Sequence, residues 1–171
     1  MQTSAVYAEP RIKIYGLNEA LNLSMFEIKL DARRIASCGL CINGLEKSGA
    51  KFELTLIQCV DPQTLFFYIL VKNIWAGKVR AHMEEHFLND AKNSVRVISP
   101  VATLYFHGPH FGDRPGIADA AFAALKKKSV QILAAVCSGS TIYIAMPQNE
   151  LEKARPIMNN VFETPTTKDH L

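Results

Sequence analysis

The residues best suited to chemistry lie in a loop rich in glycine and proline. Gly108-Pro109 and Gly112 precede Arg114-Pro115-Gly116, and an alanine-rich helical pattern starts directly afterwards. An apolar strand, such a loop and a helix start together point free backbone N–H groups at an anion. This arrangement predicts a site for a small ligand that bears a carboxylate. A tight strand-to-helix turn without a ligand is the alternative.

Three further stretches contain residue types that occur in known sites. His82-Met-Glu-Glu-His86 puts two histidines on one helix face, which suits a metal ion, but the sequence offers no evident third ligand and a solvated helix face is favoured. Cys38 and Cys41 lie within a helical pattern and have no partner motif, which favours a packing role. Ser138-Gly-Ser140 is typical of a hairpin turn, because no helix follows it. We therefore expect no catalytic residues, no metal and no cofactor.

Composition describes an ordinary soluble globular protein. The 171 residues are 49% hydrophobic and 20% charged, with a formal net charge of +3. No basic stripe with interleaved aromatics indicates nucleic-acid binding, and no apolar run reaches the length of a membrane span. Because the N-terminus carries no signal region, we expect a cytoplasmic protein. Its four cysteines stand in apolar surroundings and are expected to be reduced core residues, namely Cys38, Cys41, Cys59 and Cys137.

Hydrophobic periodicity predicts an α+β fold with an internal repeat of about 75 residues. The expected strands cover 11–17, 24–30, 51–60, 64–71, 94–99, 102–107, 130–137 and 141–146. The expected helices cover 32–48, 75–88, 117–127 and 150–162. A turn is expected at 18–22, and Pro100 is expected to end a strand. Each repeat fits the ferredoxin-like βαββαβ plan, with two helices on one face of an antiparallel sheet.

The second repeat lacks one strand at its C-terminal end, and the unassigned N-terminal strand can supply it. We therefore expect two interleaved units. The first comprises residues 24–99, and the second comprises residues 10–17 plus 100–163. Residues 1–9 and 164–171 are expected to be flexible ends.

The second unit resembles a known family. Its loop Asp113-Arg-Pro-Gly-Ile-Ala118, the helix Ala120–Leu125, the hairpin Ile132–Ile144 and the helix Glu150–Phe162 resemble the ACT domain, a small-molecule sensor of amino-acid metabolism. The similarity is strongest to the second ACT unit of aspartokinase regulatory regions. Those regions also interleave two ACT units, and an early strand completes the later one. The chain thus resembles such a regulatory region standing alone, without a kinase domain.

The resemblance implies an effector site at the loop before the first helix of an ACT unit and at the adjoining strand. By position, the loop residues are Phe111, Gly112, Asp113, Arg114, Pro115, Gly116, Ile117 and Ala118, and the strand residues are Val130, Gln131 and Ile132. Loop N–H groups would take the ligand carboxylate, and Asp113 would pair with an ammonium group. The first unit reads Asp31-Ala-Arg-Arg-Ile-Ala36 at this point, and without glycine a ligand approaches the backbone less easily.

These expectations define a regulatory function. The resemblance implies a protein that binds an amino acid or a similar small metabolite at a unit or subunit interface and controls amino-acid metabolism. It would act as a homodimer through ACT–ACT pairing or with an enzyme partner, without nucleic acid or membrane. The alternatives are a structural oligomerisation module without a ligand, and a regulatory subunit of a separate enzyme.

Overall fold

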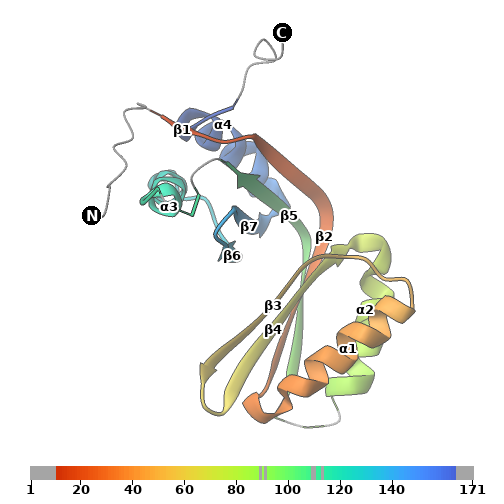
Figure 1. The fold of residues 1–171 in the computed structure, drawn as a ribbon. Coiled ribbons are helices and arrows are strands. Elements are labelled where there is room, and N and C mark those ends of the chain that lie inside the picture. The colour runs from red at the N-terminus through yellow and green to blue at the C-terminus, as the bar shows by residue number, and fades with distance from the viewer. Residues whose placement is uncertain (1–10, 89, 91, 109–110, 113, 165–171) are drawn as a thin grey trace. The chain divides into compact units, whose positions relative to one another are not determined.

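The computed structural model describes residues 11–88, 90, 92–108, 111–112 and 114–164, in two compact units (Figure 1). Unit 1 comprises Met1–Ala20 and Ala102–Leu171, and unit 2 comprises Leu21–Val101. Each unit is described by itself. The ends that we expected to be flexible lie outside the described residues, apart from Thr164.

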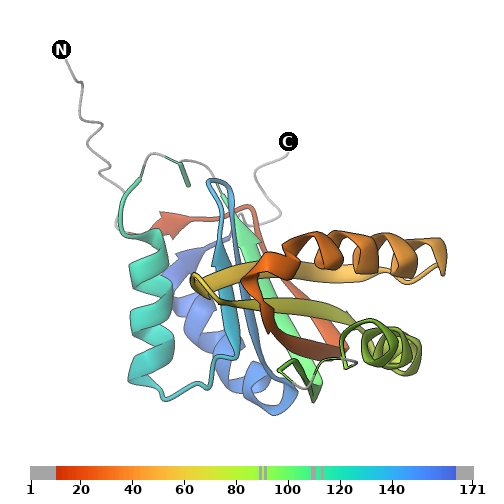
Figure 2. The same cartoon turned by 90° about the horizontal axis from the view of Figure 1, so that it is seen from below.

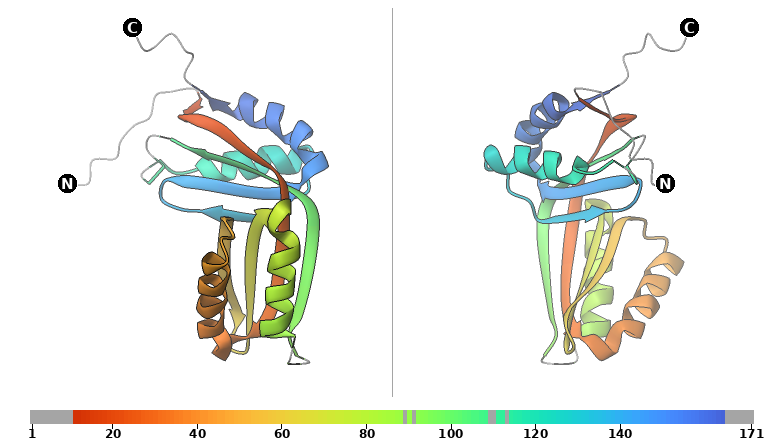
Figure 3. Two further views of the ribbon diagram at one scale, coloured as in Figure 1. Left: turned by 90° about the vertical axis from the view of Figure 1, so that its right-hand side faces the viewer. Right: turned by 60° about the vertical axis from the view of Figure 1, so that its left-hand side comes forward.

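Unit 2 is continuous in sequence and contains two helices and four strands. Strand β2 (Gly16–Asp31) leads through a short 3-10 turn, η1 (Ala32–Arg34), into α1 (Ile35–Lys47). Then follow β3 (Phe52–Asp61), β4 (Thr64–Lys72), η2 (Asn73–Trp75), α2 (Ala76–Phe87) and the first part of β5 (Ser94–His107). The strand order is β3-β4-β2-β5, and β4 pairs antiparallel with both β3 and β2. Helices α1 and α2 run along this sheet (Figure 3).

The core of unit 2 follows from two periodicities. Every second residue of β4 from Leu65 to Val71 is fully buried, as expected of a strand with one covered face. On α1 the buried residues Cys38, Cys41 and Leu45 are three and four positions apart, and on α2 the spacing of Val79, Met83 and Phe87 is four. These side chains form one cluster.

Unit 1 is assembled from two separate segments of the chain. Its N-terminal segment holds β1 (Ile12–Lys13) and the start of β2. Its second segment holds the end of β5, α3 (Ile117–Lys127), β6 (Ala134–Cys137), β7 (Thr141–Pro147), η3 (Gln148–Glu150), α4 (Leu151–Val161) and β8 (Phe162–Glu163) (Figure 2). The strand order is β2-β5-β7-β6 with an antiparallel β6–β7 pair, and β1 pairs parallel with β8.

The N-terminal segment is bound to the rest of unit 1 by side-chain contacts as well. The Glu19 carboxylate accepts two hydrogen bonds from the Arg155 guanidinium on α4, at 2.6 and 2.8 Å. Arg11 donates to the backbone carbonyls of Asn159 and Phe162. Both units thus have two helices on one face of an antiparallel sheet, which confirms the predicted α+β ferredoxin-like architecture.

Two expected breaks are absent from the described strands. Strand β2 continues through 18–22, where we expected a turn, and β5 continues through Pro100. Asn22 has φ 56°, a left-handed conformation that asparagine tolerates better than most residues. Both positions lie within about two residues of the points where the chain passes from one unit to the other. In the described residues no helix has the length and apolarity that a membrane crossing requires.

Candidate functional site

The glycine-rich loop starts where β5 ends, and its first glycine is fixed by the N-terminal segment. A Cβ on Gly108 would lie 2.7 Å from the carbonyl oxygen of Lys13 and 3.0 Å from the Cα of Ile14. Only a residue without a side chain lets two backbones approach so closely. The loop of unit 1 is therefore anchored to β1 and the residue after it.

The middle of the loop is held by one aromatic contact and one backbone contact. Phe111 is partly buried, and its ring meets the buried ring of Phe106 edge-on, with centroids 5.9 Å apart. A Cβ on Gly112 would lie 3.4 Å from the carbonyl oxygen of Gly139 in the β6–β7 turn. The loop thus lies against this hairpin turn, whose Ser138 Oγ accepts a hydrogen bond from the N–H of Thr141 at 3.0 Å. No sequence pattern predicts this contact, because it joins residues 27 positions apart.

Helix α3 begins at an open N-terminus. Gly116 precedes the helix with φ 86° and ψ 0°. A Cβ atom added to Gly116 would meet no described heavy atom within 4 Å. No side chain in the described part of the chain caps this end of the helix. The N–H groups of a first helical turn have no intrahelical partner, and the helix dipole adds partial positive charge there. This end of α3 is suited to an anion.

The other predicted loop residues contribute little side-chain chemistry. Ile117 is 4% exposed and belongs to the core, and Ala118 packs against it. Arg114 is half-buried and Pro115 is exposed, while Asp113 lies outside the described residues. The described part of this loop therefore presents mainly backbone groups to a ligand.

Val130, Gln131 and Ile132 lie at the opposite end of α3, before β6 begins. The N–H of Val130 donates to the carbonyl of Leu125 and that of Ser129 to Lys126, with Ser129 at φ 52°, which is the Schellman ending of a helix. The prediction that these residues lie on a strand is wrong, because Val130 completes the ending of α3 and β6 begins only at Ala134. Eleven helical residues span about 16 Å, so one chain does not bring this segment to the loop.

The corresponding corner of unit 2 has its own anion in place. The Asp31 carboxylate accepts hydrogen bonds from the backbone N–H of Arg33 at 2.9 Å and from its Nε and Nη2 at 2.9 and 2.7 Å. These bonds hold the pKa of Asp31 well below its usual range, and the bonds from the guanidinium contribute more than the bond from the backbone N–H. The short 3-10 turn η1, which leads into α1, is thus capped from within, whereas α1 itself has no side-chain cap at Arg34 among the described residues.

A polar hollow lies beside this capped corner. Its volume is about 370 Å³, and its lining consists of Asp31, Arg33, Pro62, Gln63 and Lys92. An adjoining hollow of about 200 Å³ shares Asp31, Gln63 and Lys92. Sequence reasoning missed this place, because its residues come from three separate stretches of the chain.

The cysteines divide into two kinds. Cys38 and Cys41 are fully buried in the core of unit 2, which confirms the predicted packing role. Burial raises the pKa of the Cys38 thiol to about 11 and that of Cys41 to about 12. Cys59 and Cys137 are exposed, so the expectation of core cysteines is wrong for these two. Both occupy outward positions on strands at the ends of the sheet order, where an apolar sequence pattern does not ensure burial.

The fold of this chain is similar to that of aspartate kinase regulatory subunits and regulatory domains. The regulatory subunit of aspartate kinase from Thermus thermophilus, in its ligand-free form, has a TM-score of 0.76 at 15% identity and matches 88% of this chain and 99% of that chain. Aspartate kinase from Synechocystis has a TM-score of 0.81 at 15% identity, over 95% of this chain and 30% of the kinase. Aspartate kinase from Clostridium acetobutylicum has a TM-score of 0.74 at 21% identity, and the match covers 92% of this chain and 37% of the kinase.

The chain thus resembles an aspartokinase regulatory region without the kinase domain. No protein-family model matches the sequence, and no curated protein matches it significantly.

Proposed function

We propose that this chain is an ACT-type regulatory module that binds an amino acid or a similar small metabolite at the loop before α3. The observation that carries this proposal is the open N-terminus of α3 at Gly116, which contrasts with the corner of unit 2 that Asp31 caps. A free helix start is a ready site for a carboxylate, whereas a filled one is not.

The ligand carboxylate would be held by backbone N–H groups of the first turn of α3. Gly116 gives it room to approach, because no described atom crowds this position. Asp113 would supply the negative charge for the ligand's ammonium group. Such a site selects a zwitterion over a simple carboxylic acid.

A second subunit would complete the site. Val130–Ile132 lie at the far end of α3 from the loop, so these residues would meet a ligand only across an interface with another chain. Pairing would occur with a second copy or with an enzyme that the module controls. The ligand would then change the strength of association by its different affinity for the paired and free states, and the module itself would be no enzyme.

A structural oligomerisation module without a ligand is the second candidate. The corner at Asp31 favours it, because that helix start is satisfied without any effector. If the loop before α3 were also satisfied in an assembly, only the pairing role would remain.

A thermal-shift panel of the twenty amino acids tests the proposal. A ligand present at 100 times its dissociation constant stabilises the folded state by about 2.7 kcal/mol. Gly116→Leu should abolish the shift, because a side chain fills the approach to the helix start. Gly49→Leu is the matched control, since Gly49 after α1 also has a positive φ, 85°, and lies in the other unit. If a folded, dimeric protein responds to none of the twenty, the structural alternative replaces the proposal; a shift that persists in Gly116→Leu places the site elsewhere.

A further inference from the structure

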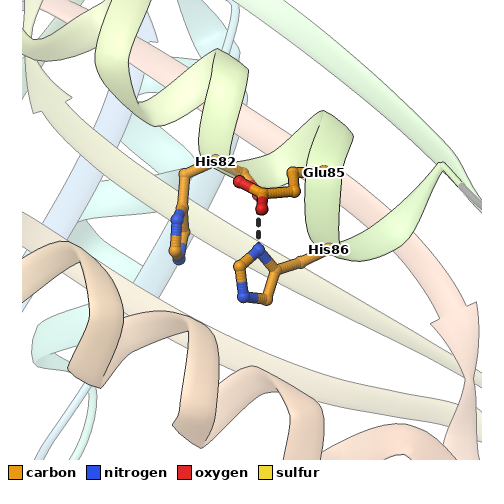
Figure 4. Close-up of side chains that lie close together, drawn as sticks. All are labelled: His82, Glu85 and His86. Atoms are coloured by element: carbon orange, nitrogen blue, oxygen red, sulfur yellow. Dashed lines mark hydrogen bonds between the residues drawn. The ribbon is translucent and has the colours of Figure 1, made fainter.

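Helix α2 of unit 2 carries three potential metal ligands on one face. His82, Glu85 and His86 are three and four positions apart, and one ligand atom from each lies within 4.8 Å of the others. The two imidazole rings are 4.0 Å apart between centroids, and the Glu85 carboxylate points toward His86 (Figure 4). The sequence pattern offered two histidines without an evident third ligand, and Glu85 lies within reach of both.

His82 is not on a fully solvated face, contrary to our expectation. Its ring is half-buried, and its Nε2 atom is enclosed and makes no hydrogen bond of good geometry to the described residues, although the backbone of Cys41 lies within reach of the ring. The ring lies over Gly44 of α1, where an added Cβ would come within 2.8 Å of Cε1 and Nε2. An enclosed imidazole nitrogen without a partner is costly, and an ion is one of the groups that satisfies it.

The second histidine has a free nitrogen of its own. His86 Nδ1 lies 3.0 Å from the carbonyl oxygen of His82, and a carbonyl can only accept, so Nδ1 carries the proton. The lone pair of Nε2 then remains available, which is the usual arrangement of a metal-binding histidine.

We propose that His82, Glu85 and His86 bind one divalent transition-metal ion of the zinc class. Two imidazoles and one carboxylate are a ligand set that Zn²⁺ takes, and three protein ligands leave a fourth position for water. Atoms around a tetrahedral zinc ion lie about 3.3 Å apart, so the exposed side chains of Glu85 and His86 must close in by about 1.5 Å at most. The nearby Cys41 thiol takes no part, because it is buried and its Sγ contacts Met83 Sδ at 3.7 Å.

Titration of the metal-stripped full chain with Zn²⁺, followed by calorimetry, tests this site. We expect saturable binding of one equivalent and no binding of Mg²⁺, which prefers oxygen ligands. His86→Gln and Glu85→Gln alter exposed side chains and should each weaken binding at least about tenfold. Gly44→Ala should weaken it as well, because the new methyl group displaces the His82 ring without removing a ligand.

Two control variants separate this site from general metal uptake. Glu84→Gln removes the neighbouring carboxylate, which pairs with Arg80 at 3.8 Å, and His107→Gln removes a histidine of unit 1. Both should bind zinc as the unaltered chain does. The proposal is overturned if the unaltered chain shows no saturable binding, or if binding survives in His86→Gln. The ion would then bind elsewhere, for example to the exposed thiol of Cys59 or to that of Cys137.

Discussion

The corners where β2 enters α1 and where β5 enters α3 occupy the same place in their units, but they treat a helix start in opposite ways. In unit 2, Asp31 places a carboxylate on the backbone N–H of Arg33 and pairs with its guanidinium. In unit 1, Gly116 leaves the helix start without a side-chain cap in the described residues. The free N–H groups of a helix start can bind a side chain of the same protein or an anion from solution. A side-chain cap leaves no place for a ligand, whereas an uncapped start can bind one.

The largest expected effect comes from the core behind each corner. Phe106→Ala and Phe67→Ala each remove a fully buried ring, from unit 1 and unit 2 respectively, and each should lower the free energy of unfolding by about 3–5 kcal/mol. Of these two residues, it is Phe106 that contacts Phe111 in the loop. Urea denaturation measures both losses, and the amino-acid thermal shift should disappear in Phe106→Ala alone. Equal ligand responses in the two variants would contradict the assignment of the site to unit 1.

The close approach at Gly108 gives the next effect. Gly108→Ala puts a methyl group 2.7 Å from the Lys13 carbonyl oxygen, so backbone must move, and we expect a loss of about 1–3 kcal/mol. Gly39→Ala meets no described atom within 4 Å and should gain about 0.5–1 kcal/mol from helix propensity. Chemical denaturation of both variants should give opposite signs. A neutral Gly108→Ala would mean that the loop is not held against the N-terminal segment.

The first helix of each unit ends in the same Schellman pattern, with a different residue in the left-handed position. Gly49 has φ 85° after α1, whereas Ser129 has φ 52° after α3. A residue with a Cβ costs roughly 1–2 kcal/mol in this conformation. Ser129→Gly should therefore raise the free energy of unfolding by about 1 kcal/mol, and Gly49→Ala should lower it by about 1–2 kcal/mol. Denaturation midpoints that move in the same direction for both variants would refute this reading of the two helix ends.

The smallest effect is the pH dependence of the Asp31 corner. Because the folded-state pKa of Asp31 is lowered, its stabilising effect is present above the unfolded pKa of about 3.9 and is lost as pH falls toward the folded value. Between about pH 4 and pH 2, Asp31→Asn should therefore lose less stability than the unaltered chain. Arg33→Gln should behave like Asp31→Asn, since it removes the guanidinium partner. A fall in stability as steep in both variants as in the unaltered chain would argue against the internal cap.

Sequence patterns predict a helix or strand well where residues at its two ends signal its start and its stop. Helix α3 was predicted at its observed bounds, because the glycine loop starts it and a lysine run ends it. The strands that run on through Asn22 and Pro100 were not predicted, since those residues are usual breakers. Asn22 and Pro100 lie close to the points where the chain passes from one unit to the other. The strands continue there because neighbouring strands pair with them, and the sequence of a strand does not show which strands pair with it.

The candidate site could be predicted only in its backbone part. The glycine and proline spacing indicated the helix start at Gly116, but the contact of Gly112 with Gly139 depends on how a distant hairpin packs. The cap at Asp31 was missed as well, because it depends on the side-chain conformation of Arg33 two residues later. The enclosure of His82 by Gly44 depends on the packing of two helices. None of these three contacts has a periodic signal.

The division of unit 1 into two segments has a consequence for protein synthesis. All residues of unit 2 are outside the ribosome once Val101 has left the exit tunnel. This unit can therefore fold while translation of the chain continues. The N-terminal segment must wait for β8, because Ile12 pairs with Phe162 and Ile14 donates to Glu163. An unpaired strand invites pairing with other chains. Slow translation of residues 102–163 should therefore favour aggregation of the nascent chain through this segment, and fast translation should suppress it.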